Sequence, residues 1–136
     1  MQTSIEAIDV PGWHSGRPYA RAVRAGGFVF TAGHVPVNPE TGATAGVDIV
    51  EQTRAVLAGV RTALAAAGCE PRDVVSTRVL LTDIADIDGM DAVYREFFTE
   101  PYPVRTTAQV SALGRAEFRV EIDVVALDRA GSDRPS

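Results

Sequence analysis

Alternating apolar and polar residues in the last third of the chain predict two β-strands. Side chains alternate between the two faces of a strand, so every second residue shares a face. In the run 118–125 the even-numbered residues are apolar, and Glu121 lies among the mostly polar odd-numbered ones. In the run 101–112 Arg105 and Thr107 share a polar face. If the two runs pair as neighbours, a guanidinium and a carboxylate lie on one sheet face, where they could bind a small carboxylate and activate a water.

A first amphipathic helix is predicted after residue 48. Asp48 is a suitable N-cap, and Glu51 three residues later resembles the pattern of a capping box. Gly68 follows at a position where a left-handed residue commonly ends a helix. The residues at helical spacing that we expect to face the core are Ile49, Thr53, Val56, Leu57, Val60 and Leu64.

Four further strands and a second helix complete the predicted order. The strands are expected at residues 4–8, 19–24, 28–32 and 74–81. Gly26 and Gly27 supply the turn between the second and third strands. The second helix begins near Asp86 or Asp88 and ends before Pro101. The residues that this helix is expected to bury are Met90, Val93, Tyr94 and Phe97.

This order of elements predicts an α+β fold, with a six-stranded mixed sheet and both helices on one face. Two amphipathic helices can cover only one face of such a sheet. The uncovered face is expected to be solvated or paired with another subunit. The polar residues expected on it are Arg21, Arg105, Gln109, Arg119 and Glu121.

The composition is that of one globular domain. The chain has 136 residues, enough for one hydrophobic core but not for two. We expect a single domain over residues 1–128 and a disordered tail over 129–136. No apolar run approaches the roughly 20 residues of a membrane span, and no secretory signal is visible. The single cysteine, Cys69, excludes an internal disulfide and favours a cytoplasmic location.

The charge pattern excludes several kinds of chemistry. The net charge is −5, and all thirteen basic residues are scattered arginines, which disfavours nucleic acid as a partner. Without lysine, Schiff-base chemistry and a Walker-type phosphate loop are both excluded. His14 and His34 are far apart and lack further ligands at metal-binding spacing, so no metal site is expected.

Eight short segments together resemble the RidA/YjgF family of reactive-intermediate deaminases, over nearly the whole chain. They span residues 18–23, 30–42, 51–53, 66–68, 73–79, 94–98, 103–107 and 120–122. Each segment alone is weak evidence for the family, but the order and spacing of all eight together are specific to it. The resemblance implies a chorismate-mutase-like fold and a homotrimer with a central barrel and sites between subunits. It also implies hydrolysis of enamine or imine intermediates such as 2-aminoacrylate to 2-keto acids and ammonia, without a metal or organic cofactor.

The resemblance also implies roles for particular residues. Arg105 corresponds to the arginine that binds the substrate carboxylate, and Glu121 to the acid that positions the attacking water. Tyr19 corresponds to a tyrosine that lines the pocket, and Gly33 to a glycine in its wall. From the residues alone, Arg105 could instead pair with an acid for structural reasons, and Glu121 could form a salt bridge with Arg119 or Arg21 within the barrel.

Several positions depart from the family pattern. Asp91 replaces a common asparagine and Thr107 a frequent cysteine, and we expect both to contact the substrate. Ala20-Arg21 replaces Ser-Gln, which adds a second cation near the expected site. Ala32-Gly33-His34 replaces Ser-Gly-Gln, so a hydroxyl is lost and an imidazole is gained. These departures bear on the choice of substrate more than on the class of reaction.

Two other interpretations stay open. One is a pathway-specific enzyme on the same trimeric architecture, resembling the trimeric chorismate mutases and acting on another small carboxylate. Arg21 would then favour a dicarboxylate. The other is a non-catalytic protein, such as a ligand sensor or a chaperone-like protein, or the translation inhibitor or ribonuclease proposed for some relatives of the family.

Overall fold

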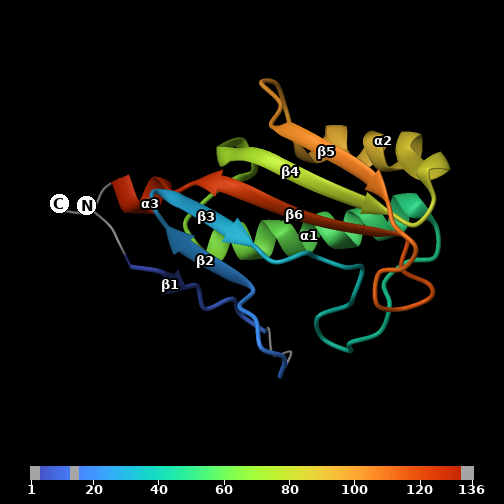
Figure 1. Cartoon of the computed structure of the whole chain (residues 1–136), viewed down its shortest axis with the longest axis horizontal. Helices are drawn as coiled ribbons and strands as arrows, with labels where there is room; N and C mark the ends of the chain where they lie inside the picture. The colour runs from blue at the N-terminus through green and yellow to red at the C-terminus, as the bar shows by residue number, and fades with distance from the viewer. Residues whose placement is uncertain (1–3, 13–15, 133–136) are drawn as a thin grey trace.

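The computed structural model describes residues 4–12 and 16–132. Within them, six strands form one sheet, and helices α1 and α2 lie on the same side of it (Figure 1). The strands are β1 (Glu6–Ala7), β2 (Ala22–Ala25), β3 (Phe28–Thr31), β4 (Val74–Leu81), β5 (Val104–Gln109) and β6 (Val120–Leu127). The helices are α1 (Ile49–Ala66), α2 (Ile87–Phe97) and the short α3 (Arg129–Ser132), with 3₁₀ turns η1 (Pro71–Asp73) and η2 (Ile84–Asp86). The α+β prediction is confirmed.

The sheet is mixed, as predicted. Its spatial order is β1-β2-β3-β6-β4-β5, and every neighbouring pair is antiparallel except β4 and β5. Parallel neighbours need a long crossover connection, which α2 provides between β4 and β5. As a result β6 lies between β3 and β4, and β5 forms one edge of the sheet (Figure 1).

The last two strands do not pair with each other, so the condition for placing Arg105 and Glu121 side by side is not met: β4 lies between β5 and β6. Arg105 on β5 is the register partner of Thr77, and both side chains contact Tyr94 of α2, so they point toward the helices. Glu121 on β6 alternates with buried core residues and points to the uncovered face. In one chain, Arg105 and Glu121 therefore lie on opposite faces of the sheet. Alternation predicts which residues of a strand share a face, but the helix packing decides which face is covered.

Helix α1 begins and ends where its capping residues predict. The Glu51 N–H donates to Oδ1 of Asp48 at 2.8 Å, and the Glu51 side chain accepts from the Asp48 N–H, so the capping box is formed. Gly68 follows the C-cap Ala67 with a φ of 79°, a left-handed conformation that glycine adopts without strain. The predicted inward positions are buried except Ile49, which is half-buried. Helix α1 thus covers the centre of the sheet.

Helix α2 covers the edge of the sheet near β4 and β5. Met90, Val93 and Tyr94 are buried as predicted. Phe97 is only half-buried, whereas Phe98, just beyond the helix, is buried. The Phe98 ring centre lies 4.6 Å from that of Tyr94, because the chain turns back toward the core after the helix ends. This packing holds the Tyr94 ring at the edge of the sheet.

The end of the chain differs from the expected disordered tail. Arg129–Ser132 form α3, and Nε of Arg129 donates to Oδ1 of Asp73 at 2.8 Å. Residues 133–136, the remainder of that predicted tail, lie outside the described residues. At the other end, β1 and β2 are shorter than the predicted strands 4–8 and 19–24.

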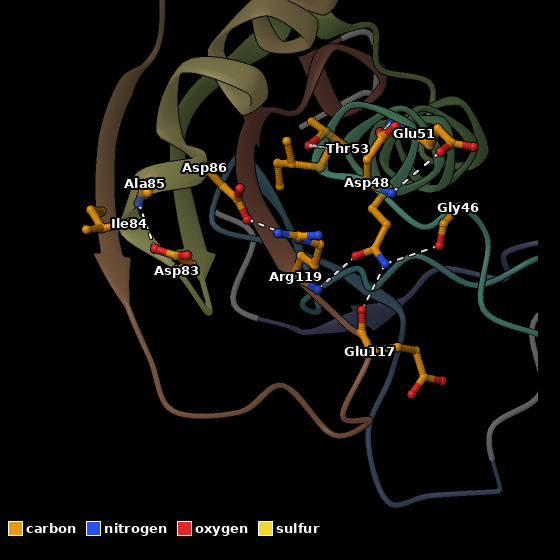
Figure 2. A network of polar contacts seen from close by, with 12 residues as sticks. Gly46, Asp48, Glu51, Thr53, Asp83, Ile84, Ala85, Asp86, Glu117 and Arg119 are labelled. Carbon is orange, nitrogen blue, oxygen red and sulfur yellow. Dashed lines mark hydrogen bonds and ion pairs between the residues drawn. The ribbon is translucent and has the colours of Figure 1, made fainter.

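A buried glutamine joins α1 to the loop that leads into β6. The amide nitrogen of Gln52 donates to the carbonyls of Glu117 at 2.9 Å and Gly46 at 3.2 Å, and its oxygen accepts from the Arg119 N–H at 2.8 Å. These partners converge from separate segments, and Nε of Arg119 donates in turn to Asp86 (Figure 2). Because Arg119 comes two residues before Glu121, the network positions the start of the strand that carries this acid.

Replacing Gln52 with leucine is expected to lower the free energy of unfolding by about 2–3 kcal/mol. Leucine fills a similar volume but leaves the Arg119 N–H and the Glu117 carbonyl without their partner, and an unpaired buried polar group costs about 1–3 kcal/mol. Urea denaturation at constant m value measures the change. Gln109→Leu is the matched control, since Gln109 is exposed and accepts a surface hydrogen bond from the Ile84 N–H. Equal effects of the two substitutions would contradict this role for Gln52.

Candidate functional site

Arg105 is held in place at the edge of the sheet by two contacts from α2. Its Nη1 donates to Oδ1 of Asp91 at 2.6 Å, and its guanidinium carbon lies 4.9 Å from the centre of the Tyr94 ring. The side chains of Arg105 and Asp91 are 25% and 22% exposed, so the ion pair is partly shielded from water. An ion pair with a cation–π contact fixes the plane of the guanidinium before any ligand binds. Arg105 therefore does pair with an acid, which was the structural alternative to substrate binding. The pair still leaves the Arg105 guanidinium accessible to a ligand.

A small cavity of about 230 Å³ opens beside this guanidinium. Its lining combines one carboxylate, two guanidinium groups and two phenol rings. The residues that line it are Asp91, Tyr94, Arg95, Tyr102, Pro103 and Arg105. Thr107 lies two residues further along β5, half-buried and outside this lining. The cavity is large enough for a small carboxylate.

Glu121 lies on the uncovered face of the sheet, against the backbone of Gly33. A Cβ atom at residue 33 would lie 2.5 Å from Oε2 of Glu121, so only glycine permits this approach. The backbone of His34 pairs with that of Ile122 through hydrogen bonds of 2.8 and 3.1 Å, which fixes Gly33 beside β6. Burial, and secondarily the Asp123 carboxylate, raises the pKa of Glu121, with Arg78 opposing. A carboxylate with a raised pKa is a stronger base than an ordinary glutamate.

A larger cavity of about 720 Å³ lies between the flank of α1 and the segments that precede and follow β2 and β3. Tyr19 and Gly33, both predicted pocket residues, line it together. Tyr19 is 52% exposed. Arg21 lines the same cavity and points toward Gly59 of α1, so its expected place on the uncovered face is wrong.

Arg21 and His34 form a hydrogen-bonded pair in the wall of this larger cavity. Nε of Arg21 donates to Nε2 of His34 at 2.7 Å, and Nδ1 of His34 lies 2.9 Å from the Ala32 carbonyl. Because Nε2 accepts, the ring proton is on Nδ1. Burial, and then the charge of Arg21, lowers the pKa of His34 to about 4, so the imidazole is neutral near pH 7. Burial also lowers the pKa of Arg21. The guanidinium keeps its charge, since arginine titrates far above neutral pH.

In one chain the predicted site residues fall into two groups. Arg105 and Asp91 contact each other on the helix side, and Gly33 contacts Glu121 on the other side. Arg119, one of the two salt-bridge partners considered for Glu121, pairs with Asp86 in the single chain. The separation arises because β4 lies between the strands that carry Arg105 and Glu121.

Several residues near these groups were not predicted from the sequence. Tyr94 was expected only as a core residue, although its helical spacing also places it beneath Arg105. Tyr102 lines the small cavity beside Pro103, in a stretch whose prolines could have marked an exposed turn. Arg115 lines the larger cavity from the loop between β5 and β6, where no local pattern predicts its position.

Two further findings concern metals and membranes. Within residues 4–12 and 16–132, no group of three or more histidine, cysteine, aspartate and glutamate side chains could hold a metal ion. In the same part of the chain, no helix combines the length and apolar character needed to cross a membrane.

The chain is similar to known proteins in both sequence and structure. The family described as Endoribonuclease L-PSP matches residues 13–128. A RutC family protein of Pyrococcus horikoshii is 40% identical over 109 residues, which cover 80% of this chain and 86% of the relative. A 2-iminobutanoate/2-iminopropanoate deaminase of Salmonella typhimurium is 36% identical over 115 residues, covering 82% of this chain and 88% of the relative. The crystal structure of YyfA, a Rid family protein of Yersinia pestis, matches with a TM-score of 0.85 and 31% identity, covering 91% of this chain and 99% of that one.

A six-stranded mixed sheet with two helices on one face is the α+β fold of the YjgF-family structures. The chain belongs to the RidA/YjgF/L-PSP (RutC) family, in which the named relatives include a deaminase of 2-imino acids. The family predicted from the eight sequence segments is confirmed.

Proposed function

We propose that this protein hydrolyses reactive 2-imino acids and their enamine tautomers, such as 2-aminoacrylate, to 2-keto acids and ammonia. The observation that carries the proposal is the cavity of about 230 Å³ around Arg105, whose guanidinium Asp91 and Tyr94 already hold in place. A fixed guanidinium can bind the carboxylate that every 2-imino acid carries. Thr107, on the same face of β5, contacts the same substrate in this proposal. Similarity to the Salmonella deaminase supports this substrate class.

In the proposed reaction Glu121 moves protons between a water and the imine nitrogen. It takes a proton from the water as the water oxygen adds to the imine carbon, and it passes this proton to the nitrogen to give a carbinolamine. The hydroxyl proton of the carbinolamine then travels through Glu121 to the nitrogen as the C–N bond breaks. Ammonia leaves, the carbon keeps the oxygen as a 2-keto acid, and Glu121 is again a carboxylate. A carboxylate in this role contributes about 10²–10⁴-fold to the rate.

The proposed site needs a second copy of the chain, since Arg105 and Glu121 lie on opposite faces in one copy. We propose a homotrimer in which the sheets form a central barrel, and the cavity around Arg105 of one copy meets Glu121 and Gly33 of the next. The uncovered face supports this assembly, because Phe28 and Phe30 project from it and are 38% and 41% exposed. Apolar side chains that gather in one exposed patch commonly mark a contact with another chain.

Complementation between two inactive variants tests the shared site. In a closed trimer each site takes Arg105 from one copy and Glu121 from its neighbour. Arg105→Ala and Glu121→Gln are each expected to be nearly inactive. When the two variants are refolded together in equal amounts, about one quarter of wild-type activity should return, because about a quarter of the interfaces then hold both intact groups. Activity is measured as the gain in 2-keto acid release when an amino acid oxidase generates the 2-imino acid in situ.

Each variant refolded alone is the control, and light scattering reports the mass of every sample. A mixed trimer without recovered activity would contradict the shared site. A monomeric mass for the active wild type would contradict the assembly. Failure of the wild-type protein to accelerate the release of 2-keto acid would contradict the deaminase proposal itself.

A further inference from the structure

The cavity of about 720 Å³ beside Gly33 is larger than a three-carbon imino acid requires. Sites of about 300–1,000 Å³ hold drug-sized ligands. A three-carbon imino acid occupies only the space of a few water molecules, at about 30 Å³ each. The cavity of about 230 Å³ around Arg105 is already sufficient for it. The larger cavity therefore leaves room for a longer side chain on the substrate.

Two arginines from distant parts of the sequence line this larger cavity. Nε of Arg21 donates to the neutral ring of His34, so this contact orients the guanidinium without cancelling its charge. Nη2 of Arg115 donates to the Gly42 carbonyl at 2.9 Å, and its Nη1 donates to Oγ1 of Thr44 at 3.1 Å. Both arginines are thus oriented by uncharged acceptors in these contacts.

The charge of the cavity lining differs in sign from that of the whole chain. The net charge of the chain is −5, whereas the charged residues that line the larger cavity, among those that the structure describes, are Arg21, Arg115 and one carboxylate, Glu40. A second carboxylate, Glu117, lies outside the lining and accepts from Thr44 beside Arg115. Two guanidinium groups in a concave wall attract an anionic group from solution.

We propose that the preferred substrates are 2-imino acids whose side chain ends in a second carboxylate, which Arg21 and Arg115 bind in the cavity beside Gly33. This inference rests on the proposed deaminase function. Gly33 connects this cavity to the proposed site of hydrolysis, because it lines the cavity and lies against Glu121, the proposed proton carrier. Arginine and carboxylate form charge-assisted hydrogen bonds, which a neutral side chain of the same length cannot make.

Calorimetry with two stable 2-keto acids of equal chain length tests this assignment. 2-Oxoglutarate ends in a carboxylate, and 2-oxopentanoate ends in a methyl group. The wild-type protein is expected to bind 2-oxoglutarate about tenfold more tightly. Arg21→Gln and Arg115→Gln are each expected to reduce this ratio to about threefold or less. Arg115 lies on an exposed loop, so its variant remains informative if Arg21→Gln fails to fold.

Arg72→Gln is the matched control. The Arg72 side chain is 79% exposed, pairs with Glu70 and is absent from the cavity lining, so the tenfold ratio should persist in this variant. Equal affinities for the two keto acids in the wild type, or no binding of 2-oxoglutarate, would overturn the inference. A ratio that neither cavity variant changes would overturn it as well.

The rate of imino acid hydrolysis separates this inference from the function on which it rests. Hydrolysis of 2-iminobutanoate without any preference for 2-oxoglutarate overturns the dicarboxylate inference and leaves the deaminase function standing. A preference for 2-oxoglutarate that depends on Arg21 and Arg115, without hydrolysis of any imino acid, supports the cavity assignment and overturns the deaminase function.

Discussion

Replacing Arg105 with alanine is expected to lower kcat/KM for 2-imino acid hydrolysis by about 10²–10³-fold. The substitution removes the guanidinium that Asp91 and Tyr94 hold in the small cavity. In the proposed complex this guanidinium pairs with the substrate carboxylate. Truncating one partner of a shielded charge pair costs about 2–5 kcal/mol, because the carboxylate is then left without its partner. The loss should appear at low substrate concentration, where the binding of the carboxylate limits the rate.

Two variants sharpen this test. Arg105→Lys keeps the charge but lacks the planar fork that binds both carboxylate oxygens, so it should recover only part of the lost activity. Arg54→Ala removes an arginine from the exposed side of α1, where it pairs with Glu96 at 3.2 Å, and should keep full activity. Undiminished activity of Arg105→Ala, with its assembly intact, would show that this arginine does not bind the substrate.

Replacing Glu121 with glutamine is expected to lower kcat by about 10²–10⁴-fold with a smaller change in KM. Glutamine has nearly the same shape, so it should still fit beneath Gly33, but it cannot accept and release a proton at neutral pH. A loss in kcat identifies a group that acts on the reacting atoms rather than one that only binds the substrate. Steady-state kinetics with 2-iminobutanoate generated in situ provides both constants.

The pH profile gives a second measure of the same role. A general base must be ionised, so the wild-type rate should rise with pH as Glu121 loses its proton. Burial, and then Asp123, raises the pKa of Glu121, so the midpoint of this rise should lie above the ordinary glutamate value of about 4.3. In Glu121→Gln this limb of the profile should disappear. A rise that persists unchanged in the variant would assign it to another group.

Patterns that act over a few residues predicted the secondary structure well. The capping box at Asp48 and the left-handed Gly68 determine the ends of α1 through contacts within one helical turn. The predicted strand 74–81 coincides with β4, since its flanking loop residues end the apolar alternation at both ends. Near β1 and β2 the same reasoning predicted strands that are too long, because few pairing partners are available at that edge of the sheet.

The neighbours of each strand could not be predicted in the same way. Strand alternation is a local property, whereas the insertion of β4 between β5 and β6 depends on α2 and on the pairing of the whole sheet. The assumption that adjacent strands pair placed Arg105 and Glu121 on one face. The structure instead places them on opposite faces of the sheet, so the site proposed above needs a second copy, which a single sequence pattern does not reveal.

The candidate site was predicted in part. Resemblance to the family predicted Arg105 and Asp91 separately as site residues, but their ion pair depends on how α2 packs against β5. Gly33, predicted to lie in the pocket wall, is approached closely by Glu121, whose carboxylate occupies the space where a side chain at residue 33 would begin. Arg115 could not be predicted, because its loop has neither helical nor strand periodicity and its position arises from contacts with Gly42 and Thr44.

The central position of β6 has a consequence for synthesis on the ribosome. The strand that joins the two halves of the sheet is the last of the six to be translated, so β3 and β4 have no shared neighbour until Val120–Leu127 emerge. Contacts between distant parts of a sequence form slowly. A strand edge with unpaired backbone N–H and C=O groups can meanwhile pair with another chain. A nascent chain that stops before Val120 therefore displays two such edges at once. The arrival of this one strand closes both.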